Sequence, residues 1–265
     1  MALKHHTNHK MRFDQQVENS RDHVIPFILE TMLLDDRTRV LEVGCGEGGV
    51  LQPFAERGCI CMGVDLDPMR IDLAEEFLEE FTSLGQITLL YKNIMDEDFQ
   101  KRWQGYFDLI VLKDVIEHIH NQEHFLAYLR NLLKPEGQVF FGFPPWYMPF
   151  GGHQQIAKRK LASIIPYYHI LPAFIYGTML RLLGESKASV AELLDIKKTG
   201  ISIERFEFIG GNNGFKIFNR RLYLINPIYQ YKFGLKPRKQ IHLFECIPFL
   251  RNFVTTCVYF TIKKI

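Results

Sequence analysis

The residues with the clearest chemical meaning lie in one glycine-rich stretch, Val40-Leu-Glu-Val-Gly-Cys-Gly-Glu-Gly-Gly49. Gly44 and Gly46 let the backbone turn sharply from a strand into a helix and approach a bound ligand closely. Asp65 ends the next apolar run, where its carboxylate can accept hydrogen bonds from both hydroxyls of a ribose. Together with Gly49 these residues fit the spacing G-x-G-x-x-G, which predicts a nucleotide-like cofactor but does not separate a nicotinamide dinucleotide from S-adenosylmethionine.

Glu42 separates these two cofactors, because it lies at the tip of the predicted strand, two residues before Gly44. A dinucleotide places its pyrophosphate at the N-terminus of the following helix, where a neighbouring carboxylate would repel it. S-adenosylmethionine has no phosphate, and its ammonium and sulfonium groups tolerate or favour an acid there. Glu42 therefore favours S-adenosylmethionine over NAD; the alternative is an exposed carboxylate at a strand end.

Candidate acid and base groups follow two later strands. Asp114, Glu117 and His118 lie at positions i, i+3 and i+4, which share one face of a helical turn. His153 comes just beyond the fifth strand. Ligands of an open α/β sheet bind at the carboxyl ends of its strands, where both segments are expected. His118 and His153 are the candidate general bases, because an unperturbed imidazole titrates near neutral pH.

The elements that must position these groups alternate between strand and helix from residue 38 to residue 142. The predicted helices are an N-terminal one over 14–34 and others near 50–57, 68–81 and 123–133, and the strands are Arg39–Val43, Ile60–Asp65, Ile87–Tyr91, Phe107–Leu112, Gln138–Phe143, Phe215–Ile225 and Val254–Lys263. Such alternation predicts an α/β fold with a doubly wound, mainly parallel, seven-stranded sheet of Rossmann-like type.

Residues 38–143 and the two last strands resemble class I S-adenosylmethionine-dependent methyltransferases of the small-molecule type. The motifs that carry the resemblance are Val40-Leu-Glu-Val-Gly-Cys-Gly-Glu-Gly, Gly63-Val-Asp-Leu-Asp, Phe107-Asp-Leu-Ile-Val-Leu-Lys-Asp-Val-Ile-Glu-His-Ile and Leu132-Leu-Lys-Pro-Glu-Gly-Gln-Val. The resemblance implies that the cofactor is S-adenosyl-L-methionine. Its methionine part would lie along Glu42, Gly44, Cys45 and Gly46, its ribose on Asp65, and its adenine against Leu66, Asn93 and Ile94, with Lys113 beside it. The family often has Asp where this chain has Asn93.

The set Asp114, Glu117, His118 and His153 also resembles the metal site of small-RNA 3′-end and some ubiquinone-pathway O-methyltransferases. Those patterns have Glu where this chain has Asp114, and the Ile-Glu-His step is also common in methyltransferases without a metal. No metal is therefore assigned, and the question of whether these four residues bind one stays open.

The strand pattern breaks after the fifth strand, which predicts two units. Residues 1–150 and 198–265 form the cofactor-binding domain, and residues 151–197 form a helical cap or lid. The cap contains eighteen residues, 163–180, without a formal charge. They suit a core of the cap itself, a lid over an apolar acceptor, or contact with an anionic membrane surface through the flanking basic residues.

Charge and cysteine content bound the remaining choices. Residues 1–150 carry 14 basic and 24 acidic side chains, whereas residues 151–265 carry 18 basic and 6 acidic ones. The second half either meets an acidic partner or attracts the first half. The odd number of cysteines, five, in or beside apolar runs predicts reduced, buried thiols and a cytoplasmic protein.

These observations predict a methyltransferase acting on a small, apolar or lipid-like acceptor, with transfer to oxygen. The alternatives are an RNA methyltransferase that uses the basic second half, and a cofactor-binding protein without catalysis. Nucleic acid is the less favoured partner because the basic residues are scattered and no RNA-binding module is evident. The oligomeric state is open.

Overall fold

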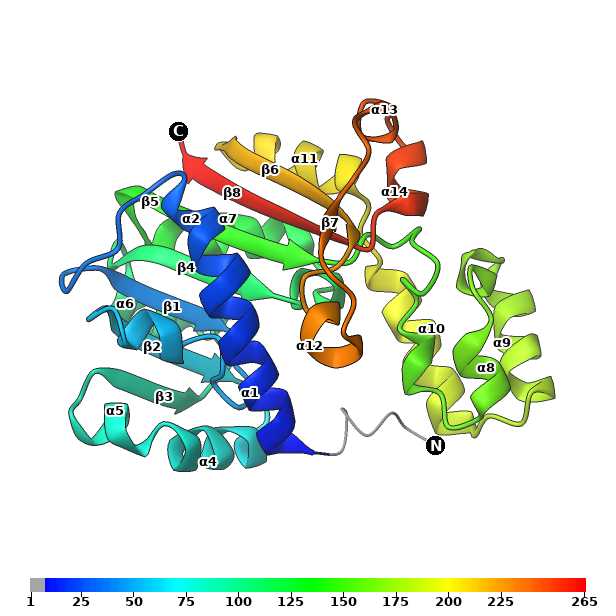
Figure 1. Cartoon of the computed structure of the whole chain (residues 1–265), viewed down its shortest axis with the longest axis horizontal. Coiled ribbons are helices and arrows are strands. Elements are labelled where there is room, and N and C mark those ends of the chain that lie inside the picture. The colour runs from blue at the N-terminus through cyan, green and yellow to red at the C-terminus, as the bar shows by residue number, and fades with distance from the viewer. Residues whose placement is uncertain (1–7) are drawn as a thin grey trace.

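The computed structural model describes residues 8–265, except for the side chain of Gln155. Its centre is one sheet of eight strands in the order β3-β2-β1-β4-β5-β8-β6-β7 (Figure 1). The strands are β1 (Arg39–Val43), β2 (Ile60–Asp65), β3 (Ile87–Tyr91), β4 (Phe107–Lys113), β5 (Leu133–Phe143), β6 (Phe215–Ile225), β7 (Arg238–Lys239) and β8 (Cys257–Lys264). Strands β1 to β5 are parallel, and β8 runs antiparallel between β5 and β6.

The doubly wound, mainly parallel sheet is confirmed, with one difference in strand number. The additional strand, β7, has two residues and pairs with the edge of β6 in a stretch predicted as loop. So short a strand has too little apolar pattern to be found in a sequence. The sequence also misses α6 (Glu97–Trp103), α11 (Ile203–Asn212) and the short helices between β6 and β8.

Helices cover both faces of the sheet because successive side chains of each buried strand point to opposite faces. One face packs against α1 (His9–Asn19), α2 (Ile25–Leu29), α3 (Gln52–Ala55), α4 (Pro68–Phe77) and α5 (Glu79–Ser83). The other packs against α6, α7 (Gln122–Leu132) and α11. Each face thus has its own apolar core, which holds the carboxyl ends of β1, β2 and β4 rigidly along one edge.

The predicted helices are present with adjusted ends. The N-terminal one continues from α1 through a π-helical turn, Ser20–Val24, into α2. The helix predicted over 68–81 begins at Pro68, with Asp67 accepting the backbone N–H of Met69 as its N-cap, and is interrupted at Leu78.

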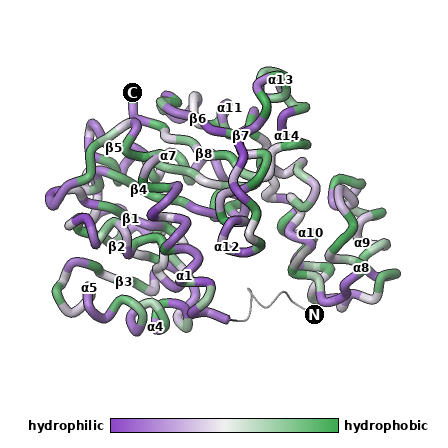
Figure 2. The backbone as a smooth tube through the Cα atoms, in the orientation of Figure 1, coloured by the Kyte–Doolittle hydropathy of each residue, from purple (hydrophilic) through white to green (hydrophobic). Residues whose placement is uncertain are grey.

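The predicted cap lies beside the carboxyl edge of the sheet (Figure 1). It contains α8 (Lys160–Ile164), α9 (Ala173–Leu182) and α10 (Lys187–Thr199). Figure 2 shows hydrophobic positions in these helices as well as in the central strands. The cap has a small core of its own: Ala157, Ala162, Tyr168, Tyr176, Leu180, Val190 and Leu193. Among residues 8–265, no helix combines the length and the apolar character that crossing a membrane requires.

A second excursion joins β6 to β8 and contains α12 (Tyr229–Phe233), α13 (His242–Glu245) and α14 (Leu250–Val254). It corrects one prediction. All five cysteines are free, and four of them are buried, but Cys246 is exposed. The reason is that it follows a short surface helix, where its sulfur lies 3.5 Å from Nε2 of His242.

Candidate active site

The glycine-rich turn after β1 has the geometry that its sequence predicts. Gly44 and Gly46 have φ angles of +68° and +54°, which disfavour any residue with a Cβ. A Cβ on Gly44 would lie 2.7 Å from Cγ2 of Val115. The backbone N–H of Gly46 donates to Oδ2 of Asp65 at 2.8 Å, so the tip of β2 fixes the turn that follows β1.

Asp65 borders an apolar cavity of about 160 Å³ at the carboxyl ends of β1 and β2. Its other carboxylate oxygen, Oδ1, accepts the N–H of Asp67 at 2.9 Å, and each oxygen retains a further lone pair for a ligand. The cavity is also lined by Leu66, Asn93 and Ile94, three predicted adenine contacts, together with Val43, Val64, Met95, Val115, Ile119 and Phe125. A flat, apolar slot with a carboxylate at its rim suits an adenosine.

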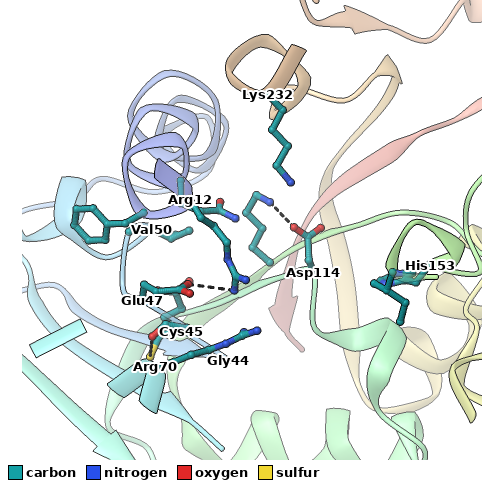
Figure 3. A pocket seen from close by; sticks show the side chains of 16 residues that line it. Arg12, Gly44, Cys45, Glu47, Val50, Arg70, Asp114, His153 and Lys232 are labelled. Carbon is teal, nitrogen blue, oxygen red and sulfur yellow. Dashed lines mark hydrogen bonds and ion pairs between the residues drawn. The ribbon is translucent and has the colours of Figure 1, made fainter. Parts of the chain in front are cut away.

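A second pocket of about 290 Å³ lies on the other side of the turn and shares Gly44 with the first (Figure 3). Of the predicted residues, it is lined by Glu42, Gly44, Cys45, Gly46, Lys113, Asp114 and His153. Three basic side chains that the sequence did not single out complete it: Arg12 from α1, Arg70 from α4 and Lys232 from α12. Arg70 follows Asp65 closely, but Arg12 and Lys232 lie far from every motif.

Glu42 is 2% exposed, so the alternative of an exposed strand-end carboxylate is wrong. Burial raises the pKa of Glu42 well above its usual range, and Lys113 opposes this only in part. Its Oε2 has no hydrogen-bond partner within the described part of the chain. A buried carboxyl group that lines a pocket with an unused oxygen is a fitting partner for a cationic ligand group.

Lys113 and Asp114 form an ion pair at the tip of β4, with 2.6 Å between Nζ and Oδ2. Burial raises the pKa of Asp114, but the charge and hydrogen bond of Lys113, together with the charges of Lys232 and His153, leave the pKa below its usual value. Asp114 has a φ angle of +58°, so its backbone is in the left-handed region. This pairing turns the Asp114 carboxylate toward Lys113.

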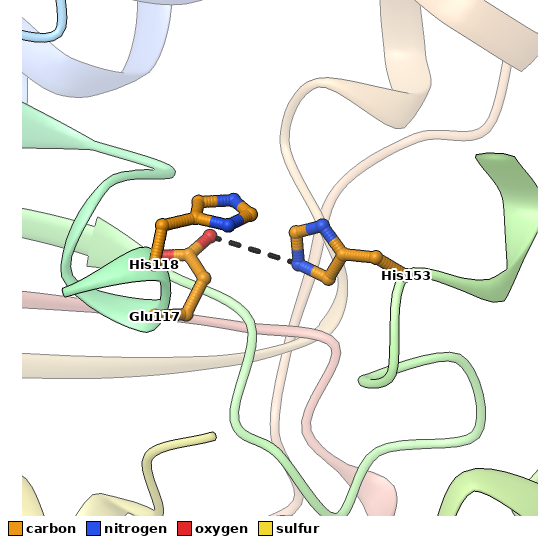
Figure 4. A group of neighbouring side chains, drawn as sticks. All are labelled: Glu117, His118 and His153. Atoms are coloured by element: carbon orange, nitrogen blue, oxygen red, sulfur yellow. Dashed lines mark ion pairs between the residues drawn. The ribbon is translucent and has the colours of Figure 1, made fainter. Parts of the chain in front are cut away.

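Glu117, His118 and His153 form a cluster, each offering one ligand atom within 4.8 Å of the others (Figure 4). Nε2 of His153 lies 3.9 Å from Oε1 of Glu117, and the two imidazole rings meet edge to face with centroids 4.8 Å apart. Glu117 is 4% exposed, and neither carboxyl oxygen has a hydrogen-bond partner among the described residues. The structure thus brings three of the four predicted groups together, while Asp114 pairs with Lys113 instead.

Desolvation sets the protonation of this cluster, in which Glu117 is buried, His153 is half-buried and His118 is the most exposed. Burial raises the pKa of Glu117 well above its usual value, and the nearby Asp114 carboxylate raises it further. Burial lowers the pKa of His118, with Asp114 opposing in part, so its imidazole is neutral near pH 7. The 3-10 turn Ile116–His118 is held from behind by Thr199, whose hydroxyl donates to the carbonyl of Glu117 at 2.6 Å. The cluster therefore presents a neutral base on a fixed turn.

Comparison with known proteins agrees with this site. Residues 9–159 match the family model described as a methyltransferase domain. The chain is similar to the ubiquinone biosynthesis O-methyltransferase of Dechloromonas aromatica (strain RCB), with 34% identity over 102 residues, or 38% of this chain and 42% of the relative. The enzyme of the same name from Histophilus somni (strain 2336) shares 30% identity over 129 residues, or 45% of this chain and 52% of the relative. The matches thus span about half or less of these curated relatives.

Solved structures share the fold at low identity. A geranyl diphosphate C-methyltransferase from Streptomyces coelicolor A3(2), solved with Mg²⁺, geranyl diphosphate and S-adenosyl-L-homocysteine, superposes with a TM-score of 0.57 at 11% identity, covering 91% of this chain and 79% of that one. A SAM-dependent methyltransferase from Aquifex aeolicus has a TM-score of 0.56 at 12% identity and covers 97% of both chains. The family match spans more than half of the chain and includes the glycine-rich turn, Asp65 and Glu117-His118. The chain therefore belongs to the methyltransferase-domain family, and its cofactor is S-adenosyl-L-methionine.

Proposed function

We propose that this protein transfers the methyl group of S-adenosylmethionine to a hydroxyl oxygen of a small, lipid-like acceptor. The names of the curated relatives support oxygen as the methylated atom. The single observation that carries the proposal is the cluster of Glu117, His118 and His153, of which His153 lines the second pocket. A hydroxyl acceptor must lose a proton on methylation, and a neutral imidazole at the pocket can take it.

The two cavities divide the ligands between them. The adenine lies in the apolar cavity against Leu66, Asn93 and Ile94, and the ribose hydroxyls bind Asp65. The methionine part follows the turn, Gly44 to Gly46, with its ammonium toward Glu42. The acceptor then enters the second pocket from the side of His153, so that its hydroxyl approaches the sulfonium at the point where the cavities join. Alignment of this kind supplies a large part of the acceleration of a displacement reaction.

Two roles are compatible with the cluster. In the first, His118 or His153 takes the proton of the acceptor directly. In the second, Glu117, His118 and His153 hold a divalent cation, which would lower the pKa of the acceptor hydroxyl. The fit to a cation rests on Glu117, because a buried carboxyl group with two unused oxygens next to two imidazoles offers three ligand atoms.

The cap contributes to the acceptor side. Of the cap side chains that the structure describes, His153 and Ile156 line the second pocket, and the helices behind them pack on their own core. The cap also exposes Phe174 and Leu182, at 75% and 82%, in a region with many lysines and arginines. These exposed side chains support contact with an anionic membrane, from which a lipid-like acceptor would enter. Co-sedimentation with anionic vesicles tests this; equal binding of wild type and Phe174→Ser/Leu182→Ser would exclude it.

Methyl transfer from isotope-labelled S-adenosylmethionine tests the proposed function. Purified protein is incubated separately with a lipid extract and an aqueous extract, with and without a chelator, and the products are identified by mass spectrometry. We expect a labelled methyl ether in the lipid fraction. Label on nitrogen or carbon, or in RNA, would contradict the proposal. Loss of activity in chelator that Mg²⁺ or Mn²⁺ restores would assign the cluster to a metal, whereas full activity would leave the histidines as direct bases.

A further inference from the structure

Four cationic side chains line the second pocket, and three of them are already paired. The pairs are Arg12 with Glu47 at 3.1 Å, Lys113 with Asp114 at 2.6 Å, and Arg70 with Asp67 at 3.5 Å. Lys232 makes no ion pair with any residue from 8 to 265. Among the described residues that line the pocket, Lys232 is therefore a cation without an ion-pair partner of its own, because the nearby Asp114 carboxylate is paired with Lys113.

The position of Lys232 is fixed by the packing of α12 on α1. The Tyr231 hydroxyl donates to Oδ2 of Asp22 at 2.6 Å, and the Tyr231 carbonyl accepts a hydrogen bond from the Gln15 side chain at 3.3 Å. The side chain of Lys232 extends from α12 into the pocket, on the side of Asp114 (Figure 3). Burial lowers the pKa of Lys232, the positive charges of Lys113 and Arg12 act in the same direction, and the Asp114 carboxylate opposes them only in part. An anion in the pocket would relieve both effects.

The cofactor has other cations for its own carboxylate. A Cβ built on Gly46 would lie 3.5 Å from Nη2 of Arg12 and 3.8 Å from Nη1 of Arg70, so both guanidinium groups cover the turn along which the methionine part lies. Lys232 stands across the pocket, on the side of Asp114 and His153 (Figure 3). Because Arg12 and Arg70 can bind the cofactor carboxylate, Lys232 is available to bind the acceptor.

We propose that Lys232 binds an oxyanion of the acceptor, a carboxylate or a phosphate, so that the substrate is an amphipathic acid and not a neutral lipid. The inference rests on the proposed function and narrows its substrate class. Lys232 and His153 both line the acceptor side of the pocket, so the ammonium would hold the acid group while the reacting hydroxyl lies near the imidazole. The charge pair also orients an otherwise apolar acceptor, which apolar contacts alone do poorly.

Calorimetry on protein loaded with S-adenosylhomocysteine tests the inference without requiring turnover. The probes are 12-hydroxydodecanoate, its methyl ester and dodecyl phosphate. The variants are Lys232→Met, Lys232→Arg and, as a control on the same surface segment, Lys236→Met, which is exposed and outside the pocket. We expect wild type and Lys236→Met to bind a charged probe roughly 10- to 100-fold more tightly than the ester. Lys232→Met loses this preference, and Lys232→Arg keeps most of it. The charged probe that binds more tightly identifies the acid group.

Three results would overturn the inference. The first two are that wild type prefers neither acid over the ester, or that Lys232→Met keeps the preference of wild type. The third is that Lys232→Met binds S-adenosylhomocysteine more weakly, which would mean that Lys232 binds the cofactor. A parallel transfer assay with pairs of hydroxy acids and esters separates this from the proposed function. Absence of ether formation from every acceptor contradicts the proposed function, while a preference for acids in binding that requires Lys232 still supports the inference. Faster methylation of esters contradicts the inference alone.

Discussion

The cavity beside Asp65 and the pocket beside Lys232 meet at Gly44 but are built differently. The first is formed largely by backbone turns and apolar side chains at the ends of β1 and β2, with Asp65 held by two backbone N–H groups. The second gathers charged side chains from α1, α4, α12 and the tip of β4, and several of them have shifted pKa values. A cofactor common to a whole family suits the first, and an acceptor particular to one protein suits the second. Because the methionine part also follows the turn that lines the second pocket, the comparison predicts that substitutions on the acceptor side, at His118, His153 and Lys232, leave the cofactor affinity unchanged.

The largest effect is expected from the bases of the acceptor side. His118→Gln and His153→Asn remove a proton acceptor, and asparagine tolerates the left-handed backbone at residue 153, where φ is +54°. General base catalysis typically contributes 10²- to 10⁴-fold, so turnover should fall by about that factor while the dissociation constant of S-adenosylhomocysteine stays constant. His124→Gln, at an exposed helix start, is the control. A weaker cofactor affinity in either variant would break the division between the two cavities.

The pH profile sharpens the same assignment. Because burial lowers the pKa of His118 from 6.5, the neutral imidazole persists to lower pH than that of a free histidine. The rate should rise with pH, level off below pH 6.5, and stay flat to neutral pH. A methyl-transfer rate that still rises with pH through pH 7 would indicate that the titrating base is a group other than His118.

On the cofactor side, Gly44→Ala should destabilise the turn. The new Cβ meets Val115 and the φ angle of +68° adds strain, so we expect a loss of about 2–4 kcal/mol in the free energy of unfolding. Gly85→Ala is a matched control, because it has the same φ angle but no atom within 4 Å, and it should cost only about 1–2 kcal/mol. Urea titration measures both. If the double variant Gly44→Ala/Val115→Ala recovers none of the stability lost in Gly44→Ala, the clash with Val115 is not the cause of that loss.

Asp65→Ala should weaken S-adenosylmethionine binding by about 1.5–3 kcal/mol, or roughly 10- to 150-fold, through lost hydrogen bonds to a charged group. Asp72→Ala, exposed on α4, should leave the affinity unchanged. Calorimetry decides it, and tight binding of NAD by wild type would contradict the cofactor assignment itself. An unchanged dissociation constant in Asp65→Ala would mean that the ribose lies elsewhere.

The smallest effect concerns Glu42, which lines the second pocket. Its folded-state pKa is raised by burial, so the folded protein keeps a proton that the unfolded chain loses near pH 4.5. Stability without ligand therefore falls as the pH rises from about 4.5 through the folded pKa. Glu42→Gln should remove this slope and make the ligand-free protein more stable at pH 7, yet weaken S-adenosylmethionine binding. If Glu42→Gln is less stable than wild type at pH 7, neighbouring groups stabilise the buried Glu42 carboxylate in the folded protein, and the prediction is wrong.

The sequence alone determined the fold class and the cofactor side. Strands buried on both faces produce continuous apolar runs, and the turn after β1 needs glycines at fixed positions, so both leave a local record along the chain. Asp65 and Glu42 could be found because each ends or borders such a strand. The two-residue strand β7 and the exposure of Cys246 were missed because short surface elements leave no periodic pattern.

Only the tertiary structure decided the acceptor side. Arg12 and Lys232 belong to helices that meet where Gln15 contacts Tyr231 across 216 residues of sequence, and no spacing rule connects positions so far apart. The cluster of Glu117, His118 and His153 also depends on tertiary structure, because His153 lies far from the other two residues in the sequence. The sequence predicts Asp114, Glu117 and His118 on one face of a helical turn, but Asp114 has a left-handed backbone before the 3-10 turn Ile116–His118. Its carboxylate pairs with Lys113, and Glu117 faces His153. Local sequence fixes the backbone, whereas burial and charge, which depend on every neighbour, fix what the pocket can bind.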